Sequence, residues 1–306
     1  MSSRSLGLFR GSRASQARSS PASCRLTSSG SSVRNRIRPS SRTVGPRFST
    51  FLFASASISE SHRLPASSLI LRPLNRRSSE PREFISGVGG IVKVGVLGSG
   101  TVGKTLASGL VQHGYEVTLG TREPRQEGAA SWAAKAPGAK TGTFRDAAKF
   151  GDLLILSVLG RAVEDVIKLA GAENFRGKVL IDTNNPISDA RPVDGVLQYF
   201  TGPNQSLGEK IQSLLPEAKV VKAFNSVGAT RMVNPHFDEG TPTMFICGND
   251  ANAKNQASEI ARRFGWEPYD CGTMVAARAL EPLCMLWCIP GFTKNQWTHA
   301  FKLLTR

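Results

Sequence analysis

Residues 91–124 read IVKVGVLGSGTVGKTLASGLVQHGYEVTLGTREP. The β-branched run 91–97 predicts a strand that ends at the motif Gly98-Ser99-Gly100-Thr101-Val102-Gly103. Apolar residues then recur at helical spacing between residues 102 and 111, which predicts a helix directly after the turn. A strand, a GxGxxG turn and a helix in this order indicate a dinucleotide-binding unit, whereas the motif alone would be a weak signal.

The three motif glycines have separate expected tasks. Gly98 permits the tight turn, Gly100 lets the backbone approach the pyrophosphate, and Gly103 lets the helix pack closely on the strand. The first N–H groups of the helix have no partner within the helix and are therefore expected to bind the phosphates. A glycine-rich turn that binds no ligand is the alternative interpretation.

The next strand, predicted at 115–120, is followed by Thr121-Arg122-Glu123-Pro124-Arg125. NAD-dependent enzymes commonly place an acidic residue at this tip to accept hydrogen bonds from the ribose 2′-hydroxyl. A hydroxyl and a guanidinium suit a 2′-phosphate instead, because the guanidinium is a permanently charged fork that matches phosphate oxygens. NADP(H) is therefore expected in preference to NAD(H), although a Glu123 side chain turned to the ribose would favour NAD(H). Arg125 either joins the phosphate site from the next helix or is a surface charge.

The remaining chain alternates strands and helices. Strands are predicted at 152–159, 178–182, 218–224, 243–247 and 267–270, and helices near 162–170, 207–215, 227–233 and 251–264. Residues 275–304 are predicted as helices that break at Pro290-Gly291. Right-handed crossovers then give an α/β fold of the Rossmann type, a doubly wound, mainly parallel sheet with extra C-terminal strands and helices. Ligands of such sheets bind outside the carboxyl ends of the strands, here near residues 157–158, 183–186 and 223–225.

The first 82 residues differ in composition from the rest of the chain. They contain 15 Arg, 23 Ser, no Lys and two acids, so they carry +13 of the formal charge of +16. This composition is typical of an organellar transit peptide and not of a folded domain, although a disordered basic tail that binds RNA or acidic lipid is the alternative. We expect removal of residues 1–82, which leaves an NADP-binding domain at 83–306 with a short C-terminal helical segment at 275–306. Length and Ser content favour the plastid (chloroplast), and the Arg density and the RFST segment make the mitochondrion the alternative.

Several classes of protein are not expected. Residues 83–306 contain 24 basic and 21 acidic residues without a basic stripe and interleaved aromatics, which argues against a nucleic-acid partner. The odd count of five Cys, without CxxC or zinc-type spacing, predicts neither a disulfide framework nor a metal site, and Cys284 and Cys288 are expected as small buried residues. The apolar run 283–292 contains Pro290 and is shorter than the ~20 residues of a membrane-spanning helix, so no span is expected.

Five motifs together resemble a known family. VGVLGSGTVGKTLASGL, TLGTREP, VLIDTNNP, VVKAFNSVGA and FICGND occur in the order and spacing of the NADP-dependent oxidoreductases typified by the reductase of the deazaflavin coenzyme F420. They are also similar to the oxidoreductase domain of the six-transmembrane epithelial antigen of prostate metalloreductases. The resemblance covers about residue 92 to the C-terminus, and the run from KVLIDTNNP through VVKAFN is more specific to it than the glycine motif.

The resemblance implies roles for individual residues. It places Ser99, Thr101 and Val102 at the pyrophosphate and ribose, and Thr121 with Arg122 at the 2′-phosphate. Ser157 and Val158 would border the adenosine, while Asn185, Ala223 and Asn225 would approach the nicotinamide. Two of these have simpler alternatives, since Asn185-Pro186 can form a turn and Asn225 can cap the helix predicted after it.

The activity expected from these observations is hydride transfer between NADP(H) and a flavin, a deazaflavin or a similar small acceptor. Such a transfer requires no side-chain acid, and the sequence shows no Ser-His-Asp, His-Asp or Lys-based constellation, so no catalytic residue is assigned. His236, which follows Pro235 in a predicted loop, is a candidate to cover the acceptor. An imine reductase of the pyrroline-5-carboxylate type and a non-catalytic NADP(H)-binding sensor are the alternatives. A homo-oligomer that pairs through the C-terminal helices is compatible with the class.

Overall fold

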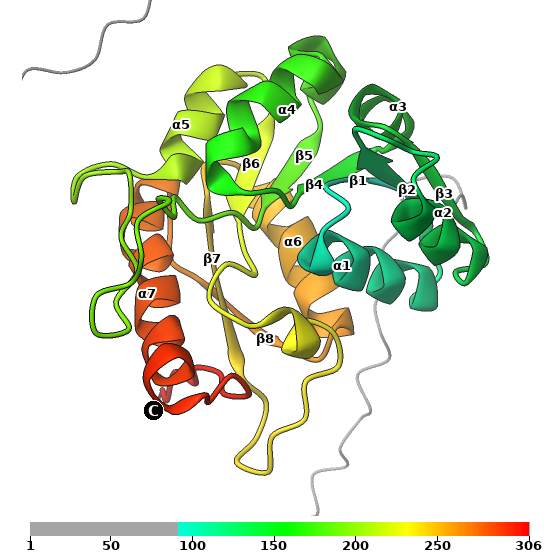
Figure 1. Ribbon diagram of the computed structural model, residues 1–306. Helices are drawn as coiled ribbons and strands as arrows, with labels where there is room; N and C mark the ends of the chain where they lie inside the picture. The colour runs from blue at the N-terminus through cyan, green and yellow to red at the C-terminus, as the bar shows by residue number, and fades with distance from the viewer. Residues whose placement is uncertain (1–90, 306) are drawn as a thin grey trace, which may run out of the picture. The chain divides into compact units, whose positions relative to one another are not determined.

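The computed structural model describes residues 91–305 (Figure 1). The transit peptide predicted at 1–82 and the predicted start of the folded domain at residue 83 lie outside the described residues.

Eight strands form one sheet in the order β3-β2-β1-β4-β5-β6-β7-β8. Neighbouring strands are parallel except for β6 and β7, which pair antiparallel. The strands are β1 Lys93–Leu97, β2 Glu116–Thr121, β3 Ala139–Thr143, β4 Leu153–Leu156, β5 Val179–Asp182, β6 Lys219–Lys222, β7 Thr243–Gly248 and β8 Glu267–Asp270. This topology confirms the predicted Rossmann-type α/β fold, with β7 and β8 as the extra C-terminal strands.

The helices cover both faces of this sheet. They are α1 Thr101–Gln112, α2 Glu127–Ala134, α3 Phe144–Phe150, α4 Val163–Ala170, α5 Leu207–Leu214, α6 Ala251–Arg263 and α7 Ala277–Lys294. Residues from α1 and α6 belong to one hydrophobic core, and residues from α3, α4, α5 and the start of α7 belong to another. Figure 1 shows α1 beside α6, and the aromatic rings of His113 and Phe264 at their ends are 5.6 Å apart.

The central strands are apolar throughout because each face is covered. In β4, Leu153 and Ile155 enter the core beneath α1 and α6, whereas Leu154 and Leu156 enter the core on the other face. This alternation follows from the two-residue period of a strand. A parallel strand that is buried on both sides therefore appears in the sequence as a continuous hydrophobic run.

The region between β2 and β4 contains elements that the sequence analysis did not predict. β3 reads AKTGT and only Gly142 in it is buried, so it has neither an apolar run nor a clear alternation. The helix α3 begins with a capping box, in which the Thr143 hydroxyl accepts from Asp146 N–H and the Asp146 carboxylate accepts from Thr143 N–H. β3 pairs with β2 and places α3 over the first two strands.

Two helix predictions in the C-terminal half were wrong. The segment 227–233 contains only a short 3₁₀ turn, Ala229–Arg231, and Asn234 then adopts a positive φ of 50°. The predicted break at Pro290-Gly291 does not occur, because α7 continues to Lys294, and residues 295–304 contain no helix. Gly291 packs closely against Trp297 in this part of the helix, since a Cβ atom there would lie 2.3 Å from the ring.

Because α7 is not interrupted at Pro290, the apolar helix is longer than the run 283–292. Within residues 91–305, the stretch Met274–Lys294 is long and apolar enough to cross a membrane by length and composition, with a mean hydropathy of 1.3. The expectation from the shorter run 283–292 therefore underestimated this helix. Core helices of globular domains meet the same criterion, and 39% of the most apolar window is buried inside the domain.

Candidate dinucleotide-binding site

A pocket of about 1180 Å³ lies at the carboxyl ends of β1, β2, β4 and β5. It exceeds the ~300–1,000 Å³ typical of small-molecule sites, which leaves room for an extended ligand. Ten of the residues that the sequence analysis assigned to the cofactor line it: Gly98, Ser99, Gly100, Thr101, Val102, Thr121, Arg122, Ser157, Val158 and Asn185. The other four, Gly103, Arg125, Ala223 and Asn225, do not line it.

The glycine turn has the geometry that its sequence predicts. Gly98 has a φ of +133°, and a Cβ atom there would lie 1.9 Å from the Ser157 carbonyl oxygen. A Cβ atom on Gly103 would lie 1.9 Å from the Gly98 carbonyl oxygen, so this glycine serves the packing of α1 on the turn. A Cβ atom on Gly100 would have no neighbour within 4 Å, apart from the adjoining residues of the chain. The space in front of Gly100 is therefore available to a ligand.

The N-terminus of α1 is equipped to bind an anion. No side chain caps it and its first turn contains no acidic residue. Lys104 N–H donates to the Gly100 carbonyl at 3.0 Å, so the amides that precede Lys104 in the helix have no α-helical partner. These amides and the helix dipole favour negative charge at this end of the pocket, which fits a pyrophosphate.

The β2 tip forms the part of the pocket that suits a 2′-phosphate. The Ser99 hydroxyl donates to the Thr121 hydroxyl at 3.1 Å, which connects the glycine turn to this tip. The Arg122 side chain is exposed and lines the pocket, as Lys168 of α4 also does. The sequence analysis did not single out Lys168, because a lone lysine on a helix carries no recognisable motif.

Arg125 does not join this group. It is exposed in the turn between β2 and α2, two residues before the helix begins. Its position agrees with the surface-charge alternative.

A hydrogen-bonded turn after β5 forms the opposite wall of the pocket. The Asn184 side chain accepts from Val158 N–H at 2.8 Å and donates to the Leu156 carbonyl at 3.2 Å. The Thr183 hydroxyl also donates to the Leu156 carbonyl, at 3.1 Å. These bonds join the tips of β4 and β5. The sequence analysis placed Asn184 among the strand-tip residues 183–186, but it assigned this residue no contact with the cofactor.

Ala223 and Asn225 support this wall from behind. Ala223 is fully buried. Asn225 is 5% exposed, and its amide donates to the Asn185 side chain at 3.1 Å and to the Leu280 carbonyl at 2.7 Å. Neither residue lines the pocket, so the predicted approach of Ala223 and Asn225 to the nicotinamide stays a prediction. Asn225 caps no α-helix either, since none follows it before β7.

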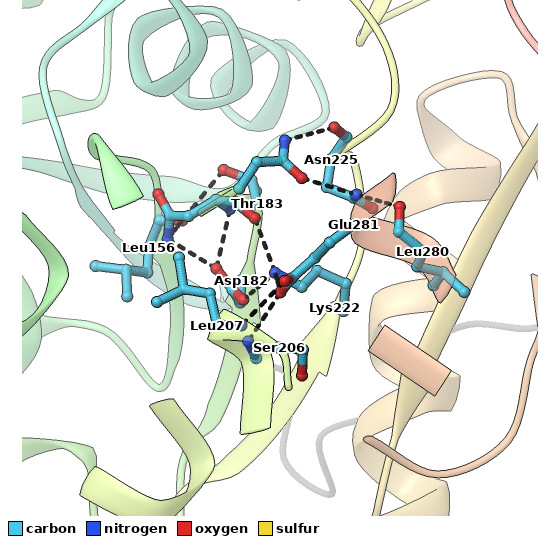
Figure 2. Close-up of polar contacts among 12 residues, drawn as sticks. Leu156, Asp182, Thr183, Ser206, Leu207, Lys222, Asn225, Leu280 and Glu281 are labelled. Atoms are coloured by element: carbon cyan, nitrogen blue, oxygen red, sulfur yellow. Dashed lines mark hydrogen bonds and ion pairs between the residues drawn. The ribbon is translucent and has the colours of Figure 1, made fainter. Parts of the chain in front are cut away.

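A Lys-based cluster lies behind the same wall and was not foreseen. Lys222 Nζ is 2.6 Å from Asp182 Oδ2 and 2.8 Å from Glu281 Oε1 (Figure 2). All three side chains are buried. The residues come from β6, β5 and α7, so no local pattern in the sequence connects them.

Other candidates from the sequence lie away from the pocket. The His236 side chain is 87% exposed and lies 3.5 Å from Asp238, and it lines no part of the pocket. Cys284 and Cys288 are buried as predicted, with their sulfur atoms 4.0 Å apart. Within residues 91–305, no group of three or more His, Cys, Asp or Glu side chains could hold a metal ion.

The site combines a doubly wound sheet, a glycine turn before a helix N-terminus without a side-chain cap, and a β2 tip that brings Thr121, Arg122 and Glu123 to the pocket. Together these features define a dinucleotide-binding domain of the oxidoreductase class. Residues 93–186 match the family described as coenzyme F420-dependent NADP oxidoreductase. A crystal structure described as that of a candidate F420-dependent NADP reductase, from Arthrobacter sp. FB24, has a TM-score of 0.66 and 32% identity, and the match covers 71% of this chain and 100% of that chain. The chain therefore belongs to the family of coenzyme F420-dependent NADP oxidoreductases.

Two curated relatives extend this comparison. Metalloreductase STEAP3 of Rattus norvegicus is 34% identical over 204 residues, which are 65% of this chain and 38% of the rat protein. The F420-dependent NADP reductase of Methanocaldococcus jannaschii is 31% identical over 144 residues, which are 46% of this chain and 63% of the archaeal protein. The matched part thus spans less than two thirds of either relative.

Proposed function

We propose that the protein transfers hydride between NADP(H) and a planar flavin or deazaflavin acceptor. The observation that carries this proposal is a second cavity, of about 390 Å³, that continues from the large pocket. The two share Gly160, Arg161, Ile187 and Ser188. Gly160 and Arg161 follow β4, whereas Ile187 and Ser188 follow β5 just beyond Asn185, the residue expected beside the nicotinamide. This overlap supports the proposal that the second cavity holds the acceptor.

The lining of the second cavity favours a flat, largely apolar ring. Ile187 and Phe200 are 36% and 44% exposed, and both contribute apolar surface to the cavity. Its two basic residues are already paired, Arg161 with Asp189 and Lys210 with Glu164. Because these four charges compensate one another, the cavity offers contact to an aromatic face more than attraction for a highly charged group.

The tasks of the protein in such a reaction are binding and orientation. NADPH, when bound, supplies the hydride. The α1 amides and the β2 tip hold the phosphates, while the wall formed by Asn184 and Asn185 limits where the nicotinamide ring can lie. Reacting atoms must approach to roughly 3–3.5 Å, and groups that enforce such a distance account for much of the rate of a bimolecular reaction.

The experiment is stopped-flow oxidation of NADPH by the full chain, followed at the nicotinamide absorbance band. FMN, FAD, a deazaflavin, a ferric chelate and a cyclic imine are offered separately. Rapid oxidation with a flavin or deazaflavin is the expected result. Oxidation by the imine alone would identify an imine reductase, and tight NADPH binding without oxidation by any acceptor would identify a nucleotide sensor.

The place of the acceptor is tested by Phe200→Ala. The variant is expected to raise the KM for the flavin about tenfold, which corresponds to a loss of ~1.4 kcal/mol of apolar contact, and to leave the Kd of NADPH unchanged. Val193→Ala is the matched control, because Val193 is 61% exposed in the same β5–α5 connection and lines neither cavity. An equal change in both variants would contradict the assignment of the second cavity.

The composition of residues 1–82 supports a further proposal, import into the plastid. A fluorescent protein fused behind these residues is expected to accumulate in plastids, and the chain without them is expected to stay in the cytosol. Accumulation of the fusion in mitochondria would select the alternative organelle, and a cytosolic fusion would contradict the transit peptide.

A further inference from the structure

Lys222, Asp182 and Glu281 form a closed ionic cluster (Figure 2). Lys222 and Asp182 are fully buried and Glu281 is 1% exposed. The Lys222 ammonium also donates to the Asn184 carbonyl at 2.8 Å. The ammonium thus has two carboxylate oxygens and one carbonyl oxygen within 2.8 Å.

The energetics of the cluster suggest a positional role. Burial of charge is costly, and a well-packed apolar group in the same place would often be as stable. Burial lowers the pKa of Lys222, but the Asp182 and Glu281 carboxylates raise it by more, so the pKa lies above its ordinary value and the ammonium stays charged. Among the described residues, Asp182 Oδ2 has no hydrogen-bond partner besides its contact with this ammonium. Without Lys222, a buried carboxylate oxygen would be left unpaired.

On one side, the cluster holds the turn that forms the pocket wall. Asp182 Oδ1 accepts from Asn184 N–H at 2.9 Å and from the Asn184 side-chain amide at 2.7 Å. Lys222 holds the carbonyl of the same residue. Asn184 is thereby fixed through its backbone N–H, its backbone carbonyl and its side-chain NH₂ group. Its side-chain oxygen in turn accepts from Val158 N–H. Both Asn184 and Val158 line the dinucleotide pocket.

On the other side, the cluster holds the start of α5. Glu281 accepts from Leu207 N–H at 3.0 Å and from Gly208 N–H at 2.9 Å. Leu207 lines the second cavity. One buried ammonium therefore connects a wall of the dinucleotide pocket with a wall of the cavity proposed for the acceptor.

We propose that Lys222 is a positioning residue for hydride transfer, which fixes the Asn184 turn and the start of α5 relative to each other without touching either substrate. This inference rests on the proposed function. A misplacement of about 1 Å between reacting groups can cost about 100-fold in rate, so a small relaxation of the two walls is expected to slow transfer more than it weakens binding.

The test compares Lys222→Met with Lys219→Met in the full chain. Lys219 lies on the same strand, where its half-exposed side chain pairs with Asp250 at 3.4 Å, so its variant loses a lysine charge outside the cluster. Lys222→Met is expected to reduce the single-turnover rate of hydride transfer about 100-fold while the Kd of 2′,5′-ADP, a fragment that lacks the nicotinamide, changes less than twofold. Lys219→Met is expected to keep both values.

Two further measurements separate positioning from general destabilisation. Amide hydrogen exchange in Lys222→Met is expected to accelerate at Val158, Leu207 and Gly208, whose N–H groups depend on the cluster, and to stay unchanged in α1. The double variant Lys222→Met, Asp182→Asn removes one of the two buried carboxylate charges that lose Lys222, and is expected to recover part of the thermal stability without recovering the rate.

The outcomes distinguish this inference from the proposed function. A wild-type rate in Lys222→Met, or unchanged exchange at Val158, would overturn the positioning role, as would full recovery of the rate in the double variant. If the wild-type protein transfers hydride from NADPH to none of the acceptors offered, the proposed function fails. The exchange data then still decide whether Lys222 fixes the two walls.

Discussion

Replacement of Gly100 by alanine is the sharpest test of the dinucleotide site, because the fold is expected to tolerate the new methyl group and the ligand is not. Gly100 has a φ of −71° and a ψ of −177°, which any residue can adopt. An added Cβ atom would meet nothing within 4 Å outside the adjoining residues. Alanine with this backbone conformation restricts the unfolded chain, which favours the native state by about 0.4–1 kcal/mol. Gly100 is also the N-cap of α1, where alanine is less favourable than glycine by a similar amount, so the two effects nearly cancel. The Tm of the variant without ligand is therefore expected to stay within about 2 °C of the wild type.

NADPH binding, by contrast, is expected to weaken. The new methyl group occupies the space in which the pyrophosphate approaches the α1 amides, and one extra methyl in a filled site costs about 1–3 kcal/mol. The Kd for NADPH is therefore expected to rise on the order of 5- to 150-fold. Titration calorimetry measures this Kd, and thermal unfolding without nucleotide measures the Tm.

Gly103→Ala is the matched control, with the same substitution three residues further along the chain. Its Cβ atom would lie 1.9 Å from the Gly98 carbonyl oxygen, so the backbone has to move. A lower Tm is expected, by several degrees for an overpacking cost of about 1–3 kcal/mol. A wild-type Kd in Gly100→Ala would refute the placement of the pyrophosphate at this turn. A fall in its Tm like that of Gly103→Ala would refute the open space seen there.

Two further predictions concern the β2 tip and the end of α1. Arg122→Gln is expected to weaken NADPH binding by about 1–3 kcal/mol, the scale of a lost charged hydrogen bond, and to leave NADH binding nearly unchanged. Equal losses of affinity for both nucleotides in binding titrations would contradict a contact between Arg122 and the 2′-phosphate. The His113 ring packs on Phe264, and its buried Nε2 atom has no hydrogen-bond partner among the described residues. Burial, and to a smaller extent the positive charge of Arg263, lowers the pKa of His113 below its ordinary value of 6.5. The unfolded chain therefore binds this proton more readily than the folded chain. The contribution of His113 to the free energy of unfolding is fully present above pH 6.5 and is lost as the pH falls below that value. Denaturant unfolding of His113→Phe between pH 7.5 and 5 is expected to show a smaller loss than the wild type, and an identical loss would exclude His113 as its source.

Local signals in the sequence predicted most of the central sheet. The hydrophobic runs of β1, β4 and β5 and the glycine turn depend on residues close together in the chain, and they formed within a few residues of the predicted ranges. β3 was missed because an edge strand with one buried residue lacks a hydrophobic pattern. The helix break at Pro290 was predicted from local propensity, but α7 continues to Lys294, and the contact between Gly291 and Trp297 there is a tertiary one.

The site divides in the same way. The residues at the glycine turn and the β2 tip were predicted because a strand, a turn and a helix place their own ligand groups. By contrast, the roles of Asn184, Asn225 and Lys222 depend on partners from other strands and from α7. No periodicity links such residues, so their burial and pairing could not be derived from the chain.

The amino-acid sequence by itself determined the Rossmann-type sheet, the dinucleotide turn and the preference for NADP(H), because short-range hydrophobic periodicity, glycine geometry and residue charge specify them locally. Only the tertiary structure decided which strand-tip residues face the ligand space, how α7 closes over a buried ammonium, and where a second cavity opens beside the first. These features arise from contacts between distant segments, and their free energy depends on burial and on partners that exist only once the sheet and helices have packed together.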